Sequence, residues 1–401
     1  MMTKKSPQLR FEGFTDDWEE RKLGELSNIV GGGTPSTSNS EYWDGDIDWY
    51  APAEIGEQRY VSKSKKTITE LGLKKSSARI LPVGTVLFTS RAGIGNTAIL
   101  GKEATTNQGF QSIVPNPNKL DSYFIYSRTN ELKRYGEVTG AGSTFVEVSG
   151  KQMSKMPIMI PELSEQKKIG SFFEQLDNTI ALHQRKLDLL KEQKKGFLQK
   201  MFPKNGEKVP ELRFAGFADD WEEHKVGNFL SESKIKGSDG SVSKKLTVKL
   251  WRKGIVPKEE IYKGSSATQY YIRLAGQFMY GKLDFLNQAF GILPNELDGY
   301  ESTLDSPAFD FKDGINPNFF LEYVCRENFY KYQGNIANGS RKAKRIHADT
   351  FFDMPITIPN FEEQQKIGSF FKQLDDTIAL HQRKLDLLKE QKKGFLQKMF
   401  V

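Results

Sequence analysis

Apolar positions in residues 165–202 recur in alternating steps of four and three residues, which is the heptad pattern of a coiled-coil helix. Residues 363–400 supply a partner, because they repeat this segment with only Lys167, Glu174 and Asn178 replaced, by Gln365, Lys372 and Asp376. The predicted seam consists of Ile169, Phe173, Leu176, Ile180, Leu187 and Leu190 in the first copy and Ile367, Phe371, Leu374, Ile378, Leu385 and Leu388 in the second.

The order of the segments along the chain predicts the direction of the two helices. The first helix leaves one globule and leads into the next, so a helix that starts from the second globule can pair along its length only by running back. At 1.5 Å per residue, a helix over residues 165–201 would extend roughly 55 Å, and the antiparallel pair is predicted to hold two globules apart as a ruler. His183 and His381 fall on the seam and are interpreted as polar residues that set the register.

The repeat also includes the start of each half. The residues from Pro7, PQLRFEGFTDDWEERKLG, match those from Pro210, PELRFAGFADDWEEHKVG, at 13 of 18 positions. Between these ends, residues 27–155 and 231–353 have diverged and share only short similar motifs, such as NQGF in the first half and NQAF in the second. The ends of the halves are thus nearly unchanged while the middles differ. This argues against a duplication without functional meaning, because random substitutions alone would be spread over the whole of each half.

Secondary structure in the diverged regions is predicted from short apolar runs bounded by Gly, Asn and Pro. TVLFTS, TAILG, GFQSIVP, YIRLAGQFMYG and AFGILPN predict strands, and SYFIYSRTNELKRYG and PNFFLEYVCRENFYKYQG each predict one helix. The expected fold class is α+β, with two α/β globules separated by a pair of long antiparallel coiled-coil helices in a pseudo-twofold internal repeat. The predicted boundaries are 1–155 for the first globule with its flank, 156–202 for the first spacer helix, 203–353 for the second globule and 354–401 for the second helix.

Composition narrows the class of protein. The formal net charge of +7, with 8 basic and 5 acidic residues in each helix copy, is compatible with a polyanionic partner. The single cysteine excludes an internal disulfide, and the four scattered histidines lack the spacing of a zinc site. No window is apolar enough for a membrane span and no signal peptide is visible, so we expect a cytoplasmic protein without a membrane partner.

Motifs that would mark an enzyme are missing from the sequence. There is no GxxxxGK[ST] phosphate loop, no GxGxxG between a strand and a helix, and no Pro-Pro dipeptide of the kind found in amino methyltransferases. Cys325 lies in an apolar helical pattern without a neighbouring histidine, which indicates a buried thiol. The acidic DDWEE boxes at Asp16 and Asp219 are interpreted as solvated turns. We therefore predict no catalytic, cofactor-binding or metal-binding residue.

A family resemblance rests on the entrance motifs MPIMIPELSEQKKIGSFFEQLD from Met156 and MPITIPNFEEQQKIGSFFKQLD from Met354, and on GGGTPSTSNSEYWDGDIDWYAPAEI and FTSRAGIGNTAILGKEATTNQGF. Through these motifs and the duplicated helices, the chain resembles, over almost its whole length, the DNA-specificity subunit (S subunit) of type I restriction-modification systems. The resemblance implies two target-recognition domains that each read one half of a split site in double-stranded DNA. It further implies that the helices set the gap and dock two methyltransferase subunits, that restriction subunits can join, and that S-adenosylmethionine binds only to the methyltransferase partner.

Candidate DNA contacts lie in polar, glycine-flanked loops, because base edges are read mainly by Arg, Lys, Asn and Gln, whereas hydroxyls often hold phosphates. In the first globule they are Thr34, Ser36, Thr37, Ser38, Tyr42, Arg91, Ser143 and Thr144, with Arg91 as the base reader. In the second they are Lys282, Asn338, Ser340, Arg341, Lys342, Lys344 and Arg345. The recurring Asn107-Gln108 and Asn287-Gln288 favour a scaffold role over base reading. Because the two readers differ, the expected target is asymmetric and interrupted.

Two other functions remain open on the sequence alone. A single-chain DNA methyltransferase or nuclease would show methyl-transfer or nicking activity in the isolated chain. A coiled-coil scaffold that does not bind DNA would lack the salt-sensitive binding to duplex DNA that our interpretation requires.

Overall fold

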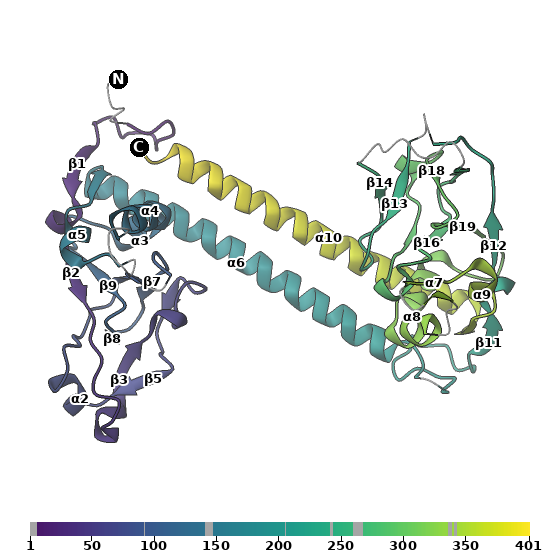
Figure 1. Cartoon of the computed structure of the whole chain (residues 1–401), viewed down its shortest axis with the longest axis horizontal. Coiled ribbons are helices and arrows are strands. Elements are labelled where there is room, and N and C mark those ends of the chain that lie inside the picture. Colours follow the sequence, from purple (N-terminus) through teal and green to yellow (C-terminus); the bar gives the residue numbers. More distant parts are fainter. Residues whose placement is uncertain are drawn as a thin grey trace. The chain divides into compact units, whose positions relative to one another are not determined.

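The fold is described by a computed structural model over residues 6–91, 93–140, 147–204, 206–240, 244–259, 268–335, 339–340 and 343–401. The chain forms two compact units, the first made of residues 1–184 with 383–401 and the second of residues 185–382 (Figure 1). Each unit contains one globule and part of both long helices, α6 (Leu163–Lys200) and α10 (Phe361–Lys398). In the part of the chain that is described, no helix combines the length and apolarity needed to cross a membrane.

The first globule contains two main sheets. One has the strand order β2-β9-β6-β7-β4 and the other the order β5-β3-β8. The strands are β2 (Ser27–Gly31), β3 (Trp43–Tyr50), β4 (Tyr60–Val61), β5 (Lys66–Ile68), β6 (Val86–Phe88), β7 (Thr97–Leu100), β8 (Thr105–Thr106) and β9 (Gln111–Pro115). The short helices are α1 (Leu23–Leu26), α2 (Glu70–Lys74), α3 (Ser122–Ser127), α4 (Thr129–Gly140) and α5 (Gly150–Ser154).

The second globule has a four-stranded sheet in the order β12-β19-β16-β17, flanked by the two-stranded pairs β13-β14, β15-β18 and β20-β21. Its strands are β12 (Leu230–Ser233), β13 (Leu246–Val248), β14 (Ile255–Pro257), β15 (Tyr271–Ile272), β16 (Phe278–Tyr280), β17 (Phe290–Ile292), β18 (Glu301–Ser302), β19 (Ala308–Phe311), β20 (Gly339–Ser340) and β21 (Ala343–Lys344). Its helices are α7 (Pro317–Val324), α8 (Glu327–Gly334) and α9 (Ala348–Phe352).

The repeated ends of the two halves build the same frame around the start of each long helix. In the first unit β1 (Glu19–Lys22) pairs antiparallel with β10 (Pro157–Ile160), and in the second β11 (Glu222–Lys225) pairs in the same way with β22 (Pro355–Ile358). The turn that precedes each frame strand is fixed by a two-point ion pair to a fully buried glutamate of the helix. Arg10 donates to Glu165 over 2.8 Å, and Arg213 donates to Glu363 over 2.7 Å.

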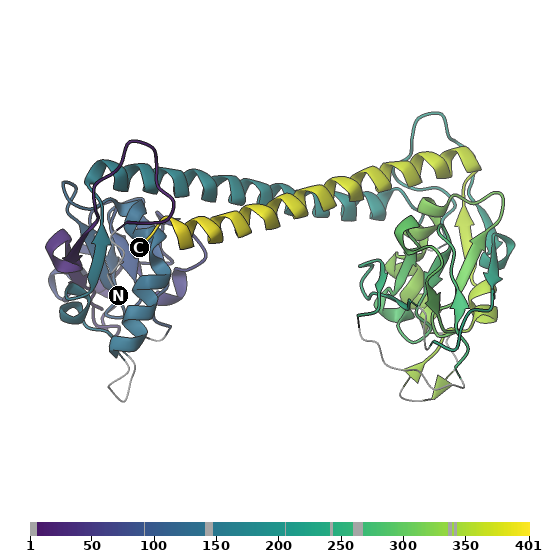
Figure 2. The same cartoon turned by 90° about the horizontal axis from the view of Figure 1, so that it is seen from above.

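A buried tryptophan completes each frame where the other helix ends. Trp18 packs against Phe124 and against Phe400 at the end of α10. Trp221 packs in the same way against Phe319 and against Phe202 after α6. Figure 2 shows the end of α10, marked C, beside the first globule. The Trp that both DDWEE boxes contain is therefore a core residue, and the acidic residues that flank it are exposed.

The two long helices pair antiparallel, as predicted. Within the first unit Phe172 near the start of α6 contacts Phe395 near the end of α10, and within the second unit Phe197 near the end of α6 contacts Phe370 near the start of α10, each with ring centroids 5.0 Å apart. The twelve predicted seam residues are all buried or half-buried, and so are both seam histidines. Together with the mixed sheets and the internal repeat, this confirms the predicted fold class.

One detail of the sequence-based prediction is wrong. Each segment predicted as a single helix is broken in two, between α3 and α4 at Arg128 and between α7 and α8 at Cys325 and Arg326. The two arginines turn inward at the breaks, where Arg128 lies over the ring of Phe400 and Arg326 over the ring of Phe202. At each break the guanidinium of an arginine lies on an aromatic ring from a distant part of the chain, and apolar periodicity does not reveal such a contact.

The buried Arg213–Glu363 pair should hold the second frame together. Glu363→Gln leaves a guanidinium that is largely buried without its counter-charge, so we expect the free energy of opening of β11 and β22 to fall by about 3 kcal/mol. Native-state hydrogen exchange would show this as protection lost in both strands. Asp353→Asn, which removes only the exposed pair with Lys225, is the control; equal effects of the two variants would contradict this account.

Candidate nucleic-acid interface

The polar loop after β2 in the first globule lies on a rigid support. Gly33 donates its backbone N–H to the carbonyl of Thr106 over 2.8 Å, and its own carbonyl accepts from the indole of Trp49 over 2.8 Å. A Cβ at Gly33 would lie only 2.3 Å from the backbone nitrogen of Ala78, so only glycine fits there. The following residues 34–38 are therefore presented from a fixed base, and Ser36 to Ser38 are exposed.

The Asn107-Gln108 turn adjoins this loop. Asn107 accepts the backbone N–H of Gly109 over 2.7 Å, which is a scaffold role. Gln108 is exposed, and its side-chain oxygen is hydrogen-bonded by the hydroxyl of Thr34. The side chain of Arg91 also lies beside this turn, since its Nε is 3.7 Å from the position that a Cβ of Gly109 would take. The structure thus brings Thr34, Gln108 and Arg91 together around one turn.

The remaining predicted contacts of the first globule are distributed as follows. Ser36 and Ser38 share a hydrogen bond of 2.8 Å between their hydroxyls, and the carbonyl of Ser36 accepts from the indole of Trp43. Tyr42 is half-buried in a short 3-10 turn, and its carbonyl accepts from the backbone of Thr69. Ser143 and Thr144 lie outside the described residues. Sequence reasoning missed Gln108 as an exposed member of the cluster, although its place in a polar, glycine-bounded turn was a signal.

In the second globule, the Asn-Gln turn supports a different element, the tip of the hairpin between β13 and β14. Trp251 and Arg252 adopt positive φ angles of 57° and 59°, and their backbone N–H groups donate to the carbonyls of Asn287 and Gln288. Consecutive non-glycine residues in this region are strained, which is a feature that gathers at functional sites. The side chain of Trp251 is 56% exposed and is flanked by exposed Lys249 and Lys253. This hairpin tip was not predicted, although KLWRKG joins three basic residues to an aromatic one.

None of the residues that were predicted to contact DNA in the second globule belongs to this hairpin tip. Lys282 is only 9% exposed, and desolvation lowers the pKa of its ammonium, so its side chain does not lie on an open surface. Arg345 is exposed and pairs with Asp305 over 3.1 Å. Ser340 and Lys344 lie on paired strands β20 and β21, and nothing is described of their side chains. Asn338, Arg341 and Lys342 lie outside the described residues.

Arg252 joins the hairpin tip to the long helices through a cluster of buried charges. It donates to Glu322 of α7 and to Asp375 of α10, and Lys194 of α6 contacts the same two carboxylates over 3.2 and 2.5 Å. Burial acts to raise the pKa of Glu322, but Arg252 and Lys194 hold it below its usual value. Nearby, desolvation raises the pKa of the Cys325 thiol to about 12, as expected for an unreactive cysteine. The cluster fixes the orientation of the hairpin tip on α10.

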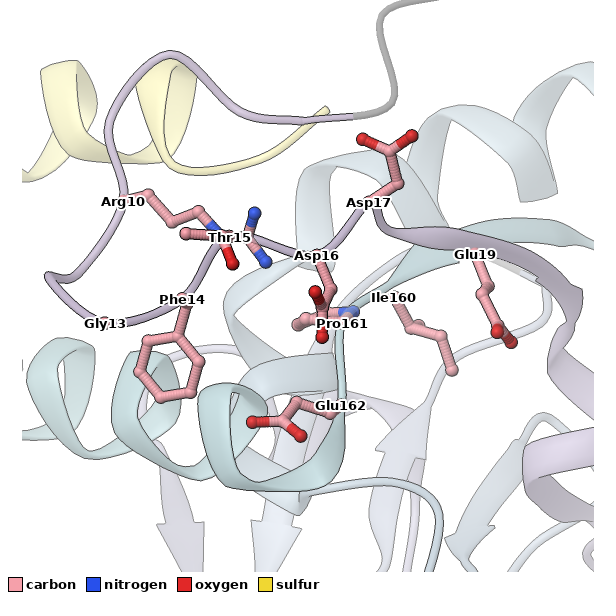
Figure 3. Close-up of a pocket in the computed structure, with 10 residues that line it drawn as sticks. All are labelled: Arg10, Gly13, Phe14, Thr15, Asp16, Asp17, Glu19, Ile160, Pro161 and Glu162. Atoms are coloured by element: carbon pink, nitrogen blue, oxygen red, sulfur yellow. The ribbon is translucent and has the colours of Figure 1, made fainter.

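The first DDWEE box borders a small pocket of about 270 Å³ in the first unit. Figure 3 shows Phe14 and Asp16 together with Pro161 and Glu162, which lead into α6, among the residues that line it. Within the ranges that the structure describes, no three His, Cys, Asp or Glu side chains gather in a way that could hold a metal ion. The carboxylates of this box are therefore better described as the solvated edge of the frame.

Comparisons with known proteins agree with this architecture. The sequence matches the type I restriction modification DNA specificity domain over residues 15–192 and 308–390. It is 37% identical over 179 residues to the type I restriction enzyme MjaIX specificity subunit of Methanocaldococcus jannaschii, a match that covers 44% of this chain and only 41% of that protein. The MjaVIII specificity subunit of the same organism is 21% identical over 95% of this chain and 91% of its own length. The crystal structure of the S subunit from M. genitalium has the same fold, with a TM-score of 0.65 over 99% of both chains at 12% identity.

If the hairpin tip of the second globule contacts nucleic acid, its exposed lysines should contribute through the phosphates. We expect the double variant Lys249→Ala, Lys253→Ala to weaken binding to duplex DNA about tenfold and to reduce the salt slope by about 2, with unchanged thermal stability. Fluorescence anisotropy over a salt series measures both quantities. Lys331→Ala, at an exposed lysine of α8, is the matched control. An unchanged salt slope in the double variant would exclude the hairpin tip from the interface.

Proposed function

This chain belongs to the family of type I restriction modification DNA specificity domains, and from that membership we propose that its two globules each read one half of an asymmetric, bipartite site in double-stranded DNA. The observation that carries the proposal is that the repeated Asn-Gln turn presents two unlike polar elements. One is the loop around Thr34, Gln108 and Arg91, and the other is the hairpin tip around Trp251. A shared support with different side chains is suited to reading two different base sequences.

We also propose that the chain is a non-catalytic subunit. The relatives are named as specificity subunits of restriction enzymes, and the sequence offers no nucleotide-binding or methyltransferase motif. In this proposal methyl transfer and cleavage belong to separate chains, and S-adenosylmethionine binds to a methyltransferase partner that flips the target base. The rival proposals of a single-chain enzyme and of a scaffold without DNA binding account less well for the family membership.

The length of α6 and α10 is proposed to set the gap between the two half-sites. Each is an unbroken helix of 38 residues, about 57 Å at 1.5 Å per residue. Their seam residues are buried or half-buried. An ion pair joins the helices at matching positions in each unit, Lys392 to Asp177 over 2.7 Å and Lys194 to Asp375 over 2.5 Å. A stiff pair of this kind would favour one spacing between two recognised base runs.

Exposed leucines on the helices are proposed docking positions for two methyltransferase subunits. The first unit has Leu182 and Leu387, and the second has Leu189 and Leu380, with exposed fractions between 50% and 64%. In the heptad pattern these four residues occupy the same position, outside the seam. Large apolar side chains that are left open on an otherwise charged helix mark interaction sites. Because the repeat supplies the same pair in each unit, two copies of one partner are expected.

The ruler can be tested by lengthening it. Inserting one heptad into both helices at equivalent positions, after Asp188 and after Asp386, should keep the seam in phase and add about 10 Å, which corresponds to roughly three base pairs. Methylated positions mapped in DNA from cells with the complete system would then lie about three base pairs further apart, with both half-sites unchanged. An unaltered gap would contradict the ruler.

The docking positions can be tested by the stoichiometry of the assembly. Leu182→Asp with Leu387→Asp should weaken the binding of one methyltransferase subunit at least tenfold, because two apolar contacts are replaced by charges. Native mass spectrometry should show one bound partner in place of two. Val138→Asp, at an exposed valine of the first globule, is the control, and two partners retained by the double variant would refute this assignment.

A further inference from the structure

The two long helices are almost identical, yet the few differences between them are not scattered over their surfaces. Over residues 165–202 and 363–400 only three positions differ, namely Lys167 against Gln365, Glu174 against Lys372 and Asn178 against Asp376. Glu174 and Asn178 are one helical turn apart and lie on the same side of α6. A chance distribution of substitutions would not be expected to follow one face of the helix.

In the first unit, Glu174 and Asn178 hold the first globule. The hydroxyl of Tyr60 donates to the carboxylate of Glu174 over 2.7 Å, and Arg59 donates to the side-chain oxygen of Asn178 over 2.9 Å. Arg59 also donates to the hydroxyl of Tyr123 over 3.3 Å. Arg59 and Tyr60 come from the diverged part of the chain, so the variable globule contacts the two variable positions of the helix.

Between these positions lies an acid that is the same in both copies. Asp177 accepts from Tyr123 over 2.9 Å and pairs with Lys392 over 2.7 Å. Its counterpart Asp375 accepts from Arg252 over 3.0 Å and pairs with Lys194. Each globule therefore contacts the equivalent acid of one helix, Asp177 on α6 or Asp375 on α10. The side chains three residues before and one residue after that acid differ between the two helices.

In the second unit, the equivalent positions are occupied differently. Lys372 pairs with Asp376 over 2.8 Å along the exposed surface of α10. Within the described part of the chain, neither side chain is hydrogen-bonded to the second globule. The second globule is anchored at Asp375 and Glu322 through Arg252, without these two positions.

The third difference follows a change of charge in the globule. Lys167 is adjacent to Gln166, whose side-chain oxygen accepts the backbone N–H of Asp121 over 3.1 Å, and Asp121 caps α3 by accepting from Phe124 over 2.8 Å. Burial raises the pKa of Asp121, and the positive charge of Lys167 opposes that shift. In the second unit the capping residue is the neutral Asn316, and the helix carries the neutral Gln365. The lysine is present in the copy whose globule presents an acid.

From these contacts we infer that positions 167, 174 and 178 of α6, which differ from positions 365, 372 and 376 of α10, are an internal address that matches the first recognition globule to α6 and disfavours its placement on α10. On α10 Tyr60 would lose its carboxylate acceptor and meet Lys372, and Arg59 would meet Asp376, an acid that Lys372 already pairs. A lost acceptor and a competing lysine disfavour the wrong partner, which is how specificity is obtained between otherwise identical surfaces. The address keeps the first reader in a defined orientation on α6, and so keeps the order of the two half-sites.

The address can be tested in the complete chain by giving α6 the side chains of α10. Glu174→Lys with Asn178→Asp should increase hydrogen exchange in residues 56–61 about tenfold, since it removes the acceptor of Tyr60 and adds a lysine that competes with Arg59 for the acid at position 178. Exchange in β9 and in the seam should stay unchanged. The milder Glu174→Gln, which removes the negative charge without adding a positive one, should give a smaller increase in exchange. If the double variant unfolds the whole first unit, this single variant is used for the measurement instead.

The reciprocal change is the matched control. Lys372→Glu with Asp376→Asn removes only an exposed pair, so exchange in α7 and in the hairpin tip should not change. In a Tyr60→Phe background the change on α6 should have a clearly smaller effect, because much of it acts through the hydroxyl of Tyr60. The inference fails if the change on α6 leaves residues 56–61 unaffected, if the reciprocal change loosens the second globule equally, or if Tyr60→Phe leaves the effect intact.

Discussion

The pairing of two equal heptad seams is the constraint on which the rest of the structure depends. Because α6 and α10 carry the same seam and run antiparallel, the start of each helix meets the end of the other, as the contacts Phe172–Phe395 and Phe197–Phe370 show. Each unit is therefore offered the same support, a helix start beside a helix end. The frame strands, the buried tryptophans and the Arg–Glu pairs are built on it twice.

Keeping this support constant leaves the globules free to differ. The Asn-Gln turn is retained in both, where it holds neighbouring backbone or side chains in place, while the element that it presents has changed from a hydroxyl-rich loop to a basic, aromatic hairpin tip. The helices also differ where the first globule contacts α6, since Glu174 and Asn178 bond to Tyr60 and Arg59 of that globule. Recognition and support are thus separable in this chain, apart from a few contacts where one must fit the other.

The sequence predicted the support far better than the readers. Heptad periodicity and an internal repeat identified both helices, their direction and all twelve seam residues, because these features depend on local pattern and connectivity. The breaks at Arg128 and Arg326 were missed because they depend on aromatic rings donated by the distant helix end. Lys282 was misjudged because burial is decided by tertiary packing. The hairpin tip was missed because its exposure depends on the contact between Trp251 and Asn287, far apart in sequence.

The central claim is that one chain presents two unlike readers to DNA at a spacing fixed by its helices. Footprinting of the assembled complex on its target at single-base resolution tests this most directly. The account predicts two short base-specific runs of different sequence, separated by a stretch of constant length in which any base is accepted. A single continuous run, two identical runs in a palindrome, or a gap that varies from site to site would contradict it.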